Sequence, residues 1–496
     1  MSMLTKSLGT TVNAPLDCAW EHVQSHSARL QHVLLSQLLA DDPQRFAHYS
    51  LRAANLLFDY SKNILDDAVI AALLKVADSA GVAAAIKQTF AGAGEHRMTG
   101  YVALRMTEGE AFIWRGVDHC ERILLERKRC GQFAEAVRSG RWLGESGRRI
   151  TDVVNIGVGG SDLGPKTVTA ALCEFTHTQV RMHFVSSMDS HDLFEKLATL
   201  KIESTLFVIA SKSFKTQTTL ANAHAALAWF KERGGNNMAK HFVAVSANAD
   251  AARAFGIVEQ NLFPVWDWVS GRFSFWCANG LTAMISIGAK RFDELLAGAR
   301  AMDKHFRTEP LSQNVPVLMA LIDAWYRRGW NAVTRQVIPT HYSLRGLPDF
   351  IEHLGPTQQV PTQQVPTHVA GRILNPADFI ITVLADHQAQ AQHQQLLAHS
   401  LGQSRALMME DNSPSNTILM AQLDPSTLGG LIALYEHKEF VSQVLADGVL
   451  NAPAVLKASR DLTLETAPLL AGQSSLVDRS TQGLVDTILK MQAPTF

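Results

Sequence analysis

The stretch VVNIGVGGSDLGP, residues 153–165, joins an apolar run, a glycine-rich turn and the start of a helical pattern. The apolar run predicts a buried strand, and the pattern over residues 163–172 predicts a helix. Glycine lets the turn bring bare N–H groups close to an anion, and the helix adds the positive end of its dipole. The stretch therefore predicts an α/β fold whose strand-to-helix turn binds an anion, with phosphate favoured. The glycines concerned are Gly157, Gly159, Gly160 and Gly164.

Two common phosphate-binding motifs do not match this turn. The pattern GxGxxG requires glycine where Asp162 stands, and the Walker pattern is interrupted by Pro165 before Lys166 and Thr167. A bound nucleotide is therefore a weak interpretation. A purely structural interpretation stays open as well, because strand-to-helix turns of α/β proteins often contain glycine.

A second unit of strand, loop and helix follows in the chain. The buried-strand run LFVIA, residues 206–210, leads into the loop SKSFKTQTT and then into a helical stretch at 221–230. Hydroxyl and ammonium groups suit a compact phosphomonoester better than an extended dinucleotide. Serine and threonine are also ordinary helix caps, so each hydroxyl has a structural alternative. The loop contributes Ser211, Lys212, Ser213, Lys215, Thr216, Thr218 and Thr219.

Gly271 and Arg272 interrupt an aromatic run, WDWVSGRFSFWCANGL at 266–281, that otherwise has the composition of protein core. A buried arginine needs an anionic partner. A guanidinium can offset negative charge that develops on a bound substrate, and a structural ion pair with a nearby acid fits the spacing equally well. This motif alone does not decide between the two.

In this order and spacing, the three segments resemble the glucose-6-phosphate isomerase (phosphoglucose isomerase) family. The resemblance extends from about residue 135 to residue 483 and includes SPSNTILMAQLDPSTLGGLIALYEHKEF at 413–440. In the first hundred or so residues only GEHRMTGYVALR, residues 94–105, is similar, to a substrate-adjacent arginine segment of the family.

The resemblance implies an α/β fold of two sugar-isomerase (SIS-type) domains, with parallel sheets sandwiched by helices, and helical N- and C-terminal portions. It implies an aldose–ketose isomerase of glycolysis and gluconeogenesis that opens a hexose 6-phosphate ring and moves a proton between C1 and C2 through an enediolate. No metal or organic cofactor is expected, and a homodimer is. Arg272 matches the arginine that stabilises the enediolate. The expected substrate-binding residues are Gly160, Ser161, Ser211, Lys212, Ser213, Thr216, Thr219 and Gly271.

The chain is a divergent member of this pattern, because it lacks the segments that carry the family's catalytic glutamate and histidine. Thr357 stands at the glutamate position and His353 at that of a substrate-facing glutamine. Threonine is not a carboxylate base near neutral pH. The histidine-bearing loop is largely missing before Gly371, and Pro453 and Arg460 replace a glutamine and a lysine.

The tandem repeat PTQQV at 356–365 predicts an extended loop in the altered region. Glu352 and His353 are the candidate substitute bases, and Lys457 or Arg460 could assist ring opening, with a solvent-facing role as the alternative for each. General acid–base groups each contribute about 10²- to 10⁴-fold to a rate. Their loss keeps a catalytically impaired or inactive sugar-phosphate-binding homologue as the alternative function.

Composition predicts a soluble cytoplasmic protein that binds neither nucleic acid nor membrane. Of 496 residues, 45 are Lys or Arg and 46 are Asp or Glu, with no basic block for a phosphate backbone. No apolar run approaches twenty residues, and no signal-peptide pattern opens the chain. A sugar-responsive DNA regulator is disfavoured because no basic helix-turn-helix stands out. Five scattered cysteines without a CxxC pair predict reduced thiols.

Alternating strand-like and helical segments predict the domain organisation. We expect a mostly helical portion at 1–114, sugar-isomerase domains at 115–290 and 291–460, and a helical tail at 461–496. Loops at the carboxyl ends of strands are where such sheets bind small molecules. The pair His22 and His26 lacks the glutamate of a zinc-binding HExxH helix, so no metal site is predicted.

Overall fold

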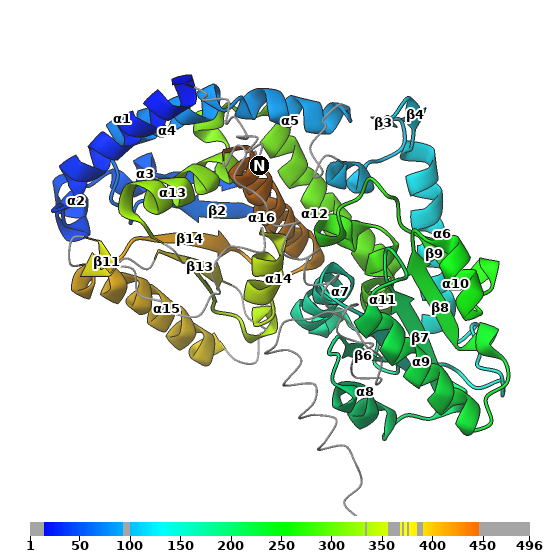
Figure 1. Cartoon of the computed structure of the whole chain (residues 1–496). Helices are drawn as coiled ribbons and strands as arrows, with labels where there is room; N and C mark the ends of the chain where they lie inside the picture. Colours follow the sequence, from blue (N-terminus) through cyan, green and yellow to red (C-terminus); the bar gives the residue numbers. More distant parts are fainter. Residues whose placement is uncertain are drawn as a thin grey trace, which may run out of the picture. The chain divides into compact units, whose positions relative to one another are not determined.

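Two five-stranded sheets organise the protein in the computed structural model (Figure 1). The structure describes residues 14–92, 100–332, 335–355, 368–369, 372–373, 376–383 and 390–445. These belong to one of two compact units, the larger one, which comprises Met1–Gly355 and Gln359–Leu445. The predictions made for Thr357, the 356–365 repeat, Gly371, Pro453, Lys457, Arg460 and the 461–496 tail lie outside the described residues.

The first sheet is entirely parallel, with strand order β6-β5-β7-β8-β9. Its central strands β5 and β7 are buried along their whole length, as expected for apolar strands covered on both faces. This confirms the parallel α/β sheet predicted from the sequence. The strands are β5 (Asp152–Gly157), β6 (Arg181–Val185), β7 (Thr205–Ala210), β8 (Phe242–Ser246) and β9 (Leu262–Pro264).

The second sheet joins residues from both ends of the described chain, with strand order β1-β2-β14-β13-β10. Strands β10, β13 and β14 are parallel, whereas a hairpin of β1 and β2 adds to β14 in the antiparallel sense. The sequence did not predict this hairpin, which lies in the portion expected to be mostly helical. The strands are β1 (Ser50–Ala53), β2 (Leu56–Asp59), β10 (Gln336–Pro339), β13 (Ala377–Thr382) and β14 (Ser415–Met420).

Two long helices, α12 (Ala289–Thr308) and α16 (Pro425–Leu445), cross closely in the core (Figure 1). A Cβ added to Gly298 would lie 1.7 Å from the carbonyl oxygen of Ser426. A Cβ on Gly429 would lie 1.9 Å from that of Leu295. Both glycines are therefore required by the close backbone approach rather than by an unusual φ. Most of the side chains of α16 are buried.

Further helices cover the sheets or link them. No single described helix is long and apolar enough to cross a membrane; α4 and α5 reach that length and hydropathy only as a pair bent by 51°. None of the five cysteines forms a disulfide. The helices are α1 (Ala14–Leu30), α2 (Leu35–Asp41), α3 (Arg45–His48), α4 (Asp67–Ser79), α5 (Val82–Ala91), α6 (Cys120–Arg138), α7 (Gly160–Ala171), α8 (Ser190–Leu197), α9 (Gln217–Glu232), α10 (Ala249–Phe255), α11 (Leu281–Ile287), α13 (Val315–Trp330), α14 (Leu347–Leu354) and α15 (Gln390–Glu410).

Two small hairpins and several 3-10 helices are the remaining elements. Two small hairpins pair β3 (Ile113–Trp114) with β4 (Val117–Asp118) and β11 (His368–Val369) with β12 (Arg372–Ile373). Among the 3-10 helices, η1 (Tyr101–Arg105) and η6 (Gly271–Trp276) bear on the candidate site.

Candidate active site

The two loops singled out from the sequence leave the same edge of the first sheet. Strands β5 and β7 are parallel neighbours, and their last residues, Gly157 and Ala210, pair in register. The turn after β5 and the loop that begins with Ser211 therefore start side by side, at the carboxyl edge where parallel sheets bind ligands. Helix α7 begins at Gly160, three residues earlier than predicted, so the connecting turn contains only Val158 and Gly159.

Glycine is required in this turn because two other segments approach it closely. Gly159 has a positive φ of 60°, and a Cβ there would lie 2.9 Å from the Cε1 atom of His353. A Cβ on Gly160 would lie only 2.0 Å from the carbonyl oxygen of Gly271. The structure thus brings the glycine turn, the start of η6 and the end of α14 together. Gly271 itself is exposed, with open space at its missing Cβ.

Arg272 binds the end of helix α14. Its Nη1 group donates a hydrogen bond to the carbonyl oxygen of Leu354 at 2.9 Å and another to that of Gly355. No ion pair within 4.0 Å involves this guanidinium among the described residues, so the structural ion pair left open by the sequence is absent there. Burial lowers the pKa of Arg272, and the negative charge of Glu439 opposes that shift.

His353 and Glu352, the candidate substitute bases, have different surroundings on α14. The His353 ring is half-buried over Gly159, whereas Glu352 is exposed. Burial, followed by the positive charge of Arg272, lowers the pKa of His353 to about 4. The imidazole is therefore neutral near pH 7 and can accept a proton, but so low a pKa makes it a weak base.

The lysine of the hydroxyl-rich loop is bound to the backbone rather than extended into solvent. Lys212 Nζ donates to the carbonyl oxygens of Asp267 at 2.8 Å and Val269 at 2.7 Å, and burial lowers its pKa. These bonds hold the loop against the segment that leads into η6. The lysine charge therefore lies between the loop and the arginine-bearing turn.

The hydroxyls of this loop differ in their bonding. Ser211 Oγ donates to Thr216 Oγ1 at 3.3 Å, and Ser213 Oγ accepts the backbone N–H of Lys215 at 3.3 Å. The Thr219 hydroxyl is buried and has no hydrogen-bond partner in the part of the chain that the structure describes. Phe214 has a positive φ of 49°, a strained conformation for a bulky residue of the kind often found at functional sites.

Two buried acids near these loops were missed by the sequence analysis. Asp162 lies in the first turn of α7, and burial raises its pKa to about 6, against the opposing charge of Lys166. Its Oδ1 atom has no hydrogen-bond partner among the described residues. The sequence signal was weak, because an acid in the first turn of a helix is common, and in the motif comparison Asp162 stands out only as the residue that breaks GxGxxG.

Glu439 is the second acid, located on α16 with 7% of its surface exposed. Its Oε1 atom accepts a hydrogen bond from Gln443 Nε2 at 3.1 Å, one helical turn further on. Burial raises the pKa of Glu439, and the charges of Lys438, Arg272 and Arg327 oppose that shift. No sequence signal distinguished Glu439, because it directly follows three other polar residues, Glu436, His437 and Lys438.

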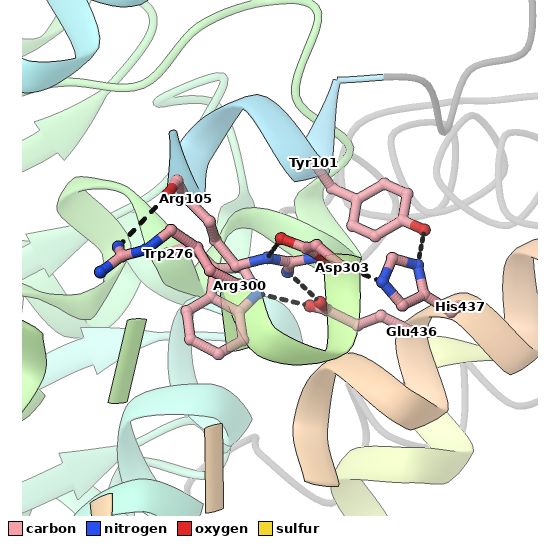
Figure 2. A network of polar contacts seen from close by, with 7 residues as sticks. All are labelled: Tyr101, Arg105, Trp276, Arg300, Asp303, Glu436 and His437. Atoms are coloured by element: carbon pink, nitrogen blue, oxygen red, sulfur yellow. Dashed lines mark hydrogen bonds and ion pairs between the residues drawn. The ribbon is translucent and has the colours of Figure 1, made fainter. Parts of the chain in front are cut away.

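Behind η6 lies a buried cluster of charges around Arg105, the last residue of the segment expected to be substrate-adjacent (Figure 2). Arg105 is fully buried and donates to Asp303 Oδ2 at 2.8 Å and to Glu436 Oε2 at 2.5 Å. Glu436 also accepts the Trp276 indole N–H at 2.7 Å. The guanidinium is thus engaged inside the core, and through Glu436 it holds the far end of the helix that carries Arg272.

The same cluster contains a hydrogen-bonded histidine. His437 shares one hydrogen bond with Asp303 Oδ1 at 2.8 Å and another with the Tyr101 hydroxyl at 2.6 Å (Figure 2). Burial lowers the pKa of His437 to about 4 and raises that of Glu436 to about 7, although Arg105 opposes the rise. Burial therefore favours the neutral forms of both side chains.

No group of three or more His, Cys, Asp or Glu side chains is arranged to hold a metal ion in the part of the chain that the structure describes. His22 and His26 contact each other edge to face with ring centroids 4.9 Å apart. They lie on α1, far along the chain from the loops described above.

Comparison with known proteins places these segments in a family. The family model described as Phosphoglucose isomerase matches residues 59–359 and 409–450. The chain is 40% identical to glucose-6-phosphate isomerase 1 of Cupriavidus pinatubonensis, over 86% of this chain and 89% of that protein. It is 35% identical to glucose-6-phosphate isomerase of Pseudomonas aeruginosa, over 95% and 98% of the two chains.

The fold matches a solved structure as well. The crystal structure of a glucose-6-phosphate isomerase from Chlamydia trachomatis superposes with a TM-score of 0.81 at 22% identity, covering 96% of this chain and 100% of that one. The family model leaves residues 1–58, 360–408 and 451–496 unmatched, and the internal gap overlaps the region where the sequence predicts a departure from the family.

Proposed function

The chain belongs to the phosphoglucose isomerase family, and from this premise we propose that it interconverts glucose 6-phosphate and fructose 6-phosphate. The observation that carries the proposal is the meeting of three segments at one sheet edge: the glycine turn, the hydroxyl-rich loop and the turn with Arg272. Each supplies a group that a sugar phosphate needs, and the reaction proceeds by ring opening and proton transfer through an enediolate.

In this proposal the hydroxyl-rich loop binds the phosphate and the glycine turn binds the sugar. The Thr219 hydroxyl supports a ligand there, because it is buried without a partner among the described residues and a ligand oxygen would satisfy it. The positive φ of Phe214 agrees with this, since such strain is common at functional sites. The phosphate-binding residues are Ser211, Lys212, Ser213, Thr216 and Thr219, and the sugar-binding residues are Gly160, Ser161 and Gly271.

Arg272 offsets the negative charge of the enediolate. Its hydrogen bonds to described residues use Nη1 alone, which leaves the Nη2 and Nε groups for a substrate oxygen. The carbonyl bonds to Leu354 and Gly355 fix the guanidinium before substrate binds, and a fixed charge costs no reorganisation during the reaction. The proposal needs no metal and no organic cofactor.

We further propose that the protein acts as a cytoplasmic homodimer that contacts neither nucleic acid nor membrane. The domain boundaries expected from the sequence, 1–114, 115–290, 291–460 and 461–496, enter this proposal unchanged. Light scattering of the purified chain at micromolar concentration tests the dimer, for which a mass of twice 54.3 kDa is expected.

The test of the function is conversion of glucose 6-phosphate to fructose 6-phosphate by protein purified from a host without its own isomerase. We expect turnover by the unchanged chain and its loss in Arg272→Ala. A folded protein without turnover would contradict the isomerase function. Calorimetry with fructose 6-phosphate would then show whether the site still binds a sugar phosphate.

A further inference from the structure

Proton transfer between C1 and C2 requires a base, and the residue at the family's glutamate position is Thr357. A substitute must lie near Arg272, because the base and the arginine act on the same pair of carbon atoms. Among the described residues, Glu439 is the acid whose charge interacts with the Arg272 guanidinium. Resting on the proposed function, we propose that Glu439 is the carboxylate that moves the proton in this chain.

The helical register of α16 places Glu439 on the same face as an acid that contacts η6. That acid, Glu436, accepts a hydrogen bond from Trp276 in η6 (Figure 2). Residues three apart lie on one face of a helix, so Glu439 lies one turn along from that contact. Arg272 stands at the start of η6, and its charge interacts with that of Glu439.

Helix α14 lies next to both α16 and η6, and we call the place where these three helices meet the corner of the site. It packs against α16, η6 and α7, and the Arg272 guanidinium binds the carbonyl oxygens of its last turn. At this corner His353 lies against the glycine turn, and the carbonyl oxygen of Leu354 accepts a hydrogen bond from Arg272. Helix α16 carries the carboxylate, Glu439. Three groups that an enediolate mechanism needs, a sugar-binding turn, a cation and a carboxylate, meet at this corner.

The carboxylate of Glu439 is not neutralised by a close partner. Within the described part of the chain it forms no ion pair within 4.0 Å, although Arg272, Lys438 and Arg327 all exert an attraction on it. Burial outweighs these attractions and raises its pKa above the ordinary value of 4.5. A carboxylate with a raised pKa is the stronger base, and the absence of a close pair with Arg272 leaves both groups able to act on a substrate.

Other acids and bases near the site fit this role less well. Glu352 is exposed, and His353 has a pKa of about 4, which makes it a weaker base than a carboxylate with a raised pKa. Asp162 is buried, but its electrostatic neighbours are Lys166, Ser186 and residues of α8, on the side of β6. Glu439 is the acid that combines burial with an interaction with Arg272.

The proton transfer balances without a further reactant. The Glu439 carboxylate takes the proton from C2 of open-chain glucose 6-phosphate. The electron pair of the C–H bond forms the C1–C2 double bond while the C1 carbonyl π bond breaks toward O1, and Arg272 offsets the charge that this places on oxygen. The hydroxyl proton of O2 passes to O1, the C2 carbonyl forms, and Glu439 returns its proton to C1, which gives fructose 6-phosphate and restores the carboxylate.

The test compares the unchanged chain with Glu439→Gln and Glu439→Asp, in turnover and in exchange of the C2 proton of glucose 6-phosphate with deuterated solvent. We expect Glu439→Gln to lower kcat by about 10²- to 10⁴-fold and to abolish exchange, with little change in KM. Glu439→Asp should retain part of the activity. Glu294→Gln, a surface change on α12, is the matched control and should keep full activity.

A pH profile separates a base from a merely structural residue. The unchanged chain should lose kcat on acidification with a midpoint above pH 4.5, because the base must be ionised, and Glu439→Gln should lose this acidic limb. Full activity of a folded Glu439→Gln variant would overturn the assignment while leaving the isomerase function intact. Loss of activity in Glu352→Gln instead would transfer the role to Glu352. Absence of exchange by the unchanged chain would overturn both proposals.

Discussion

Arg105 and Arg272 are linked through the short helix η6, yet their surroundings differ in kind. Arg272 lies at the start of η6, and Trp276 at its end shares Glu436 with Arg105. The Arg105 guanidinium is saturated by two buried carboxylates at 2.5–2.8 Å. Among the described residues Arg272 is bound only by backbone carbonyls, and the acid whose charge interacts with it, Glu439, stays beyond ion-pair distance. A saturated cation fixes the fold, whereas a cation with unused donors can serve a ligand. The same residue type is thus structural in one place and available for chemistry in the other.

The largest expected effect is on stability, from substitution of the saturated arginine. Arg105→Leu leaves Asp303 and Glu436 buried without their cation, so we expect a loss of about 3–5 kcal/mol in the free energy of unfolding. Urea denaturation followed by circular dichroism measures it. Arg291→Leu removes a surface pair with Glu294 and is the control, with an expected change below about 1 kcal/mol. Equal losses in both variants would show that the buried ion pairs of Arg105 stabilise the fold no more than a surface pair does.

Substitution of Arg272, the arginine with unused donors, should lower catalysis more than stability. Arg272→Ala is expected to lower kcat by about 10²- to 10³-fold, or about 2.7–4 kcal/mol of transition-state stabilisation. Its unfolding free energy should fall by no more than about 1.5 kcal/mol, because only hydrogen bonds to carbonyls are lost. Steady-state kinetics and urea denaturation of the same sample compare the two. Arg253→Ala, an exposed change on α10, should affect neither.

A third effect concerns the pH dependence of the saturated cluster. The pKa of Glu436 is raised from 4.5 to about 7, so between these values the folded state binds a proton that the unfolded state has released. The contribution of Glu436 to stability is therefore present below pH 4.5 and is lost as pH rises through 7. From pH 5 to pH 8 the unchanged chain should lose about 1–3 kcal/mol relative to Glu436→Gln. A difference that stays constant with pH would contradict a raised pKa.

The smallest expected effect is on ligand binding, from a substitution in the glycine turn. Gly160→Ala places a methyl group where the Gly271 carbonyl lies, so the glycine turn and the arginine-bearing turn must move apart. We expect binding of fructose 6-phosphate to weaken by about tenfold, equivalent to about 1.4 kcal/mol, in isothermal calorimetry. Gly402→Ala is the control, because a Cβ there meets nothing within 4 Å. Unchanged binding in Gly160→Ala would show that this contact does not position the site.

Local sequence patterns predicted the fold class and the loops of the site. Apolar runs at 153–156 and 206–210 gave the strands of a parallel sheet, and parallel strands necessarily place their following loops at one edge. The helix after the first run begins earlier than periodicity indicated, because glycine and serine conceal the first turn of α7. Local patterning thus defines which segments form the site, but less well where each element begins.

Contacts between distant segments were not predictable in this way. The packing of His353 on Gly159 depends on the approach of α14, which no local pattern contains. Glu439 stands beside other polar residues in α16, so only the tertiary structure reveals that it is buried and interacts with a cation. Arg105 came from a recognisable segment, yet its engagement by Asp303 and Glu436 depends on residues about 200 and 330 positions away. Long-range packing decides which charged residues remain available.

The hairpin of β1 and β2 has a consequence for biosynthesis. Asn63, just after β2, bonds to Ser415 at the start of β14, a residue 352 positions later in the chain. At a translation rate of 5–20 residues per second, the hairpin waits about 18 to 70 s for its partner to be made. During that time one strand edge stands open to other nascent chains. Chaperone demand in the cell should therefore depend on this early hairpin more than on the parallel sheet that completes itself within one continuous stretch.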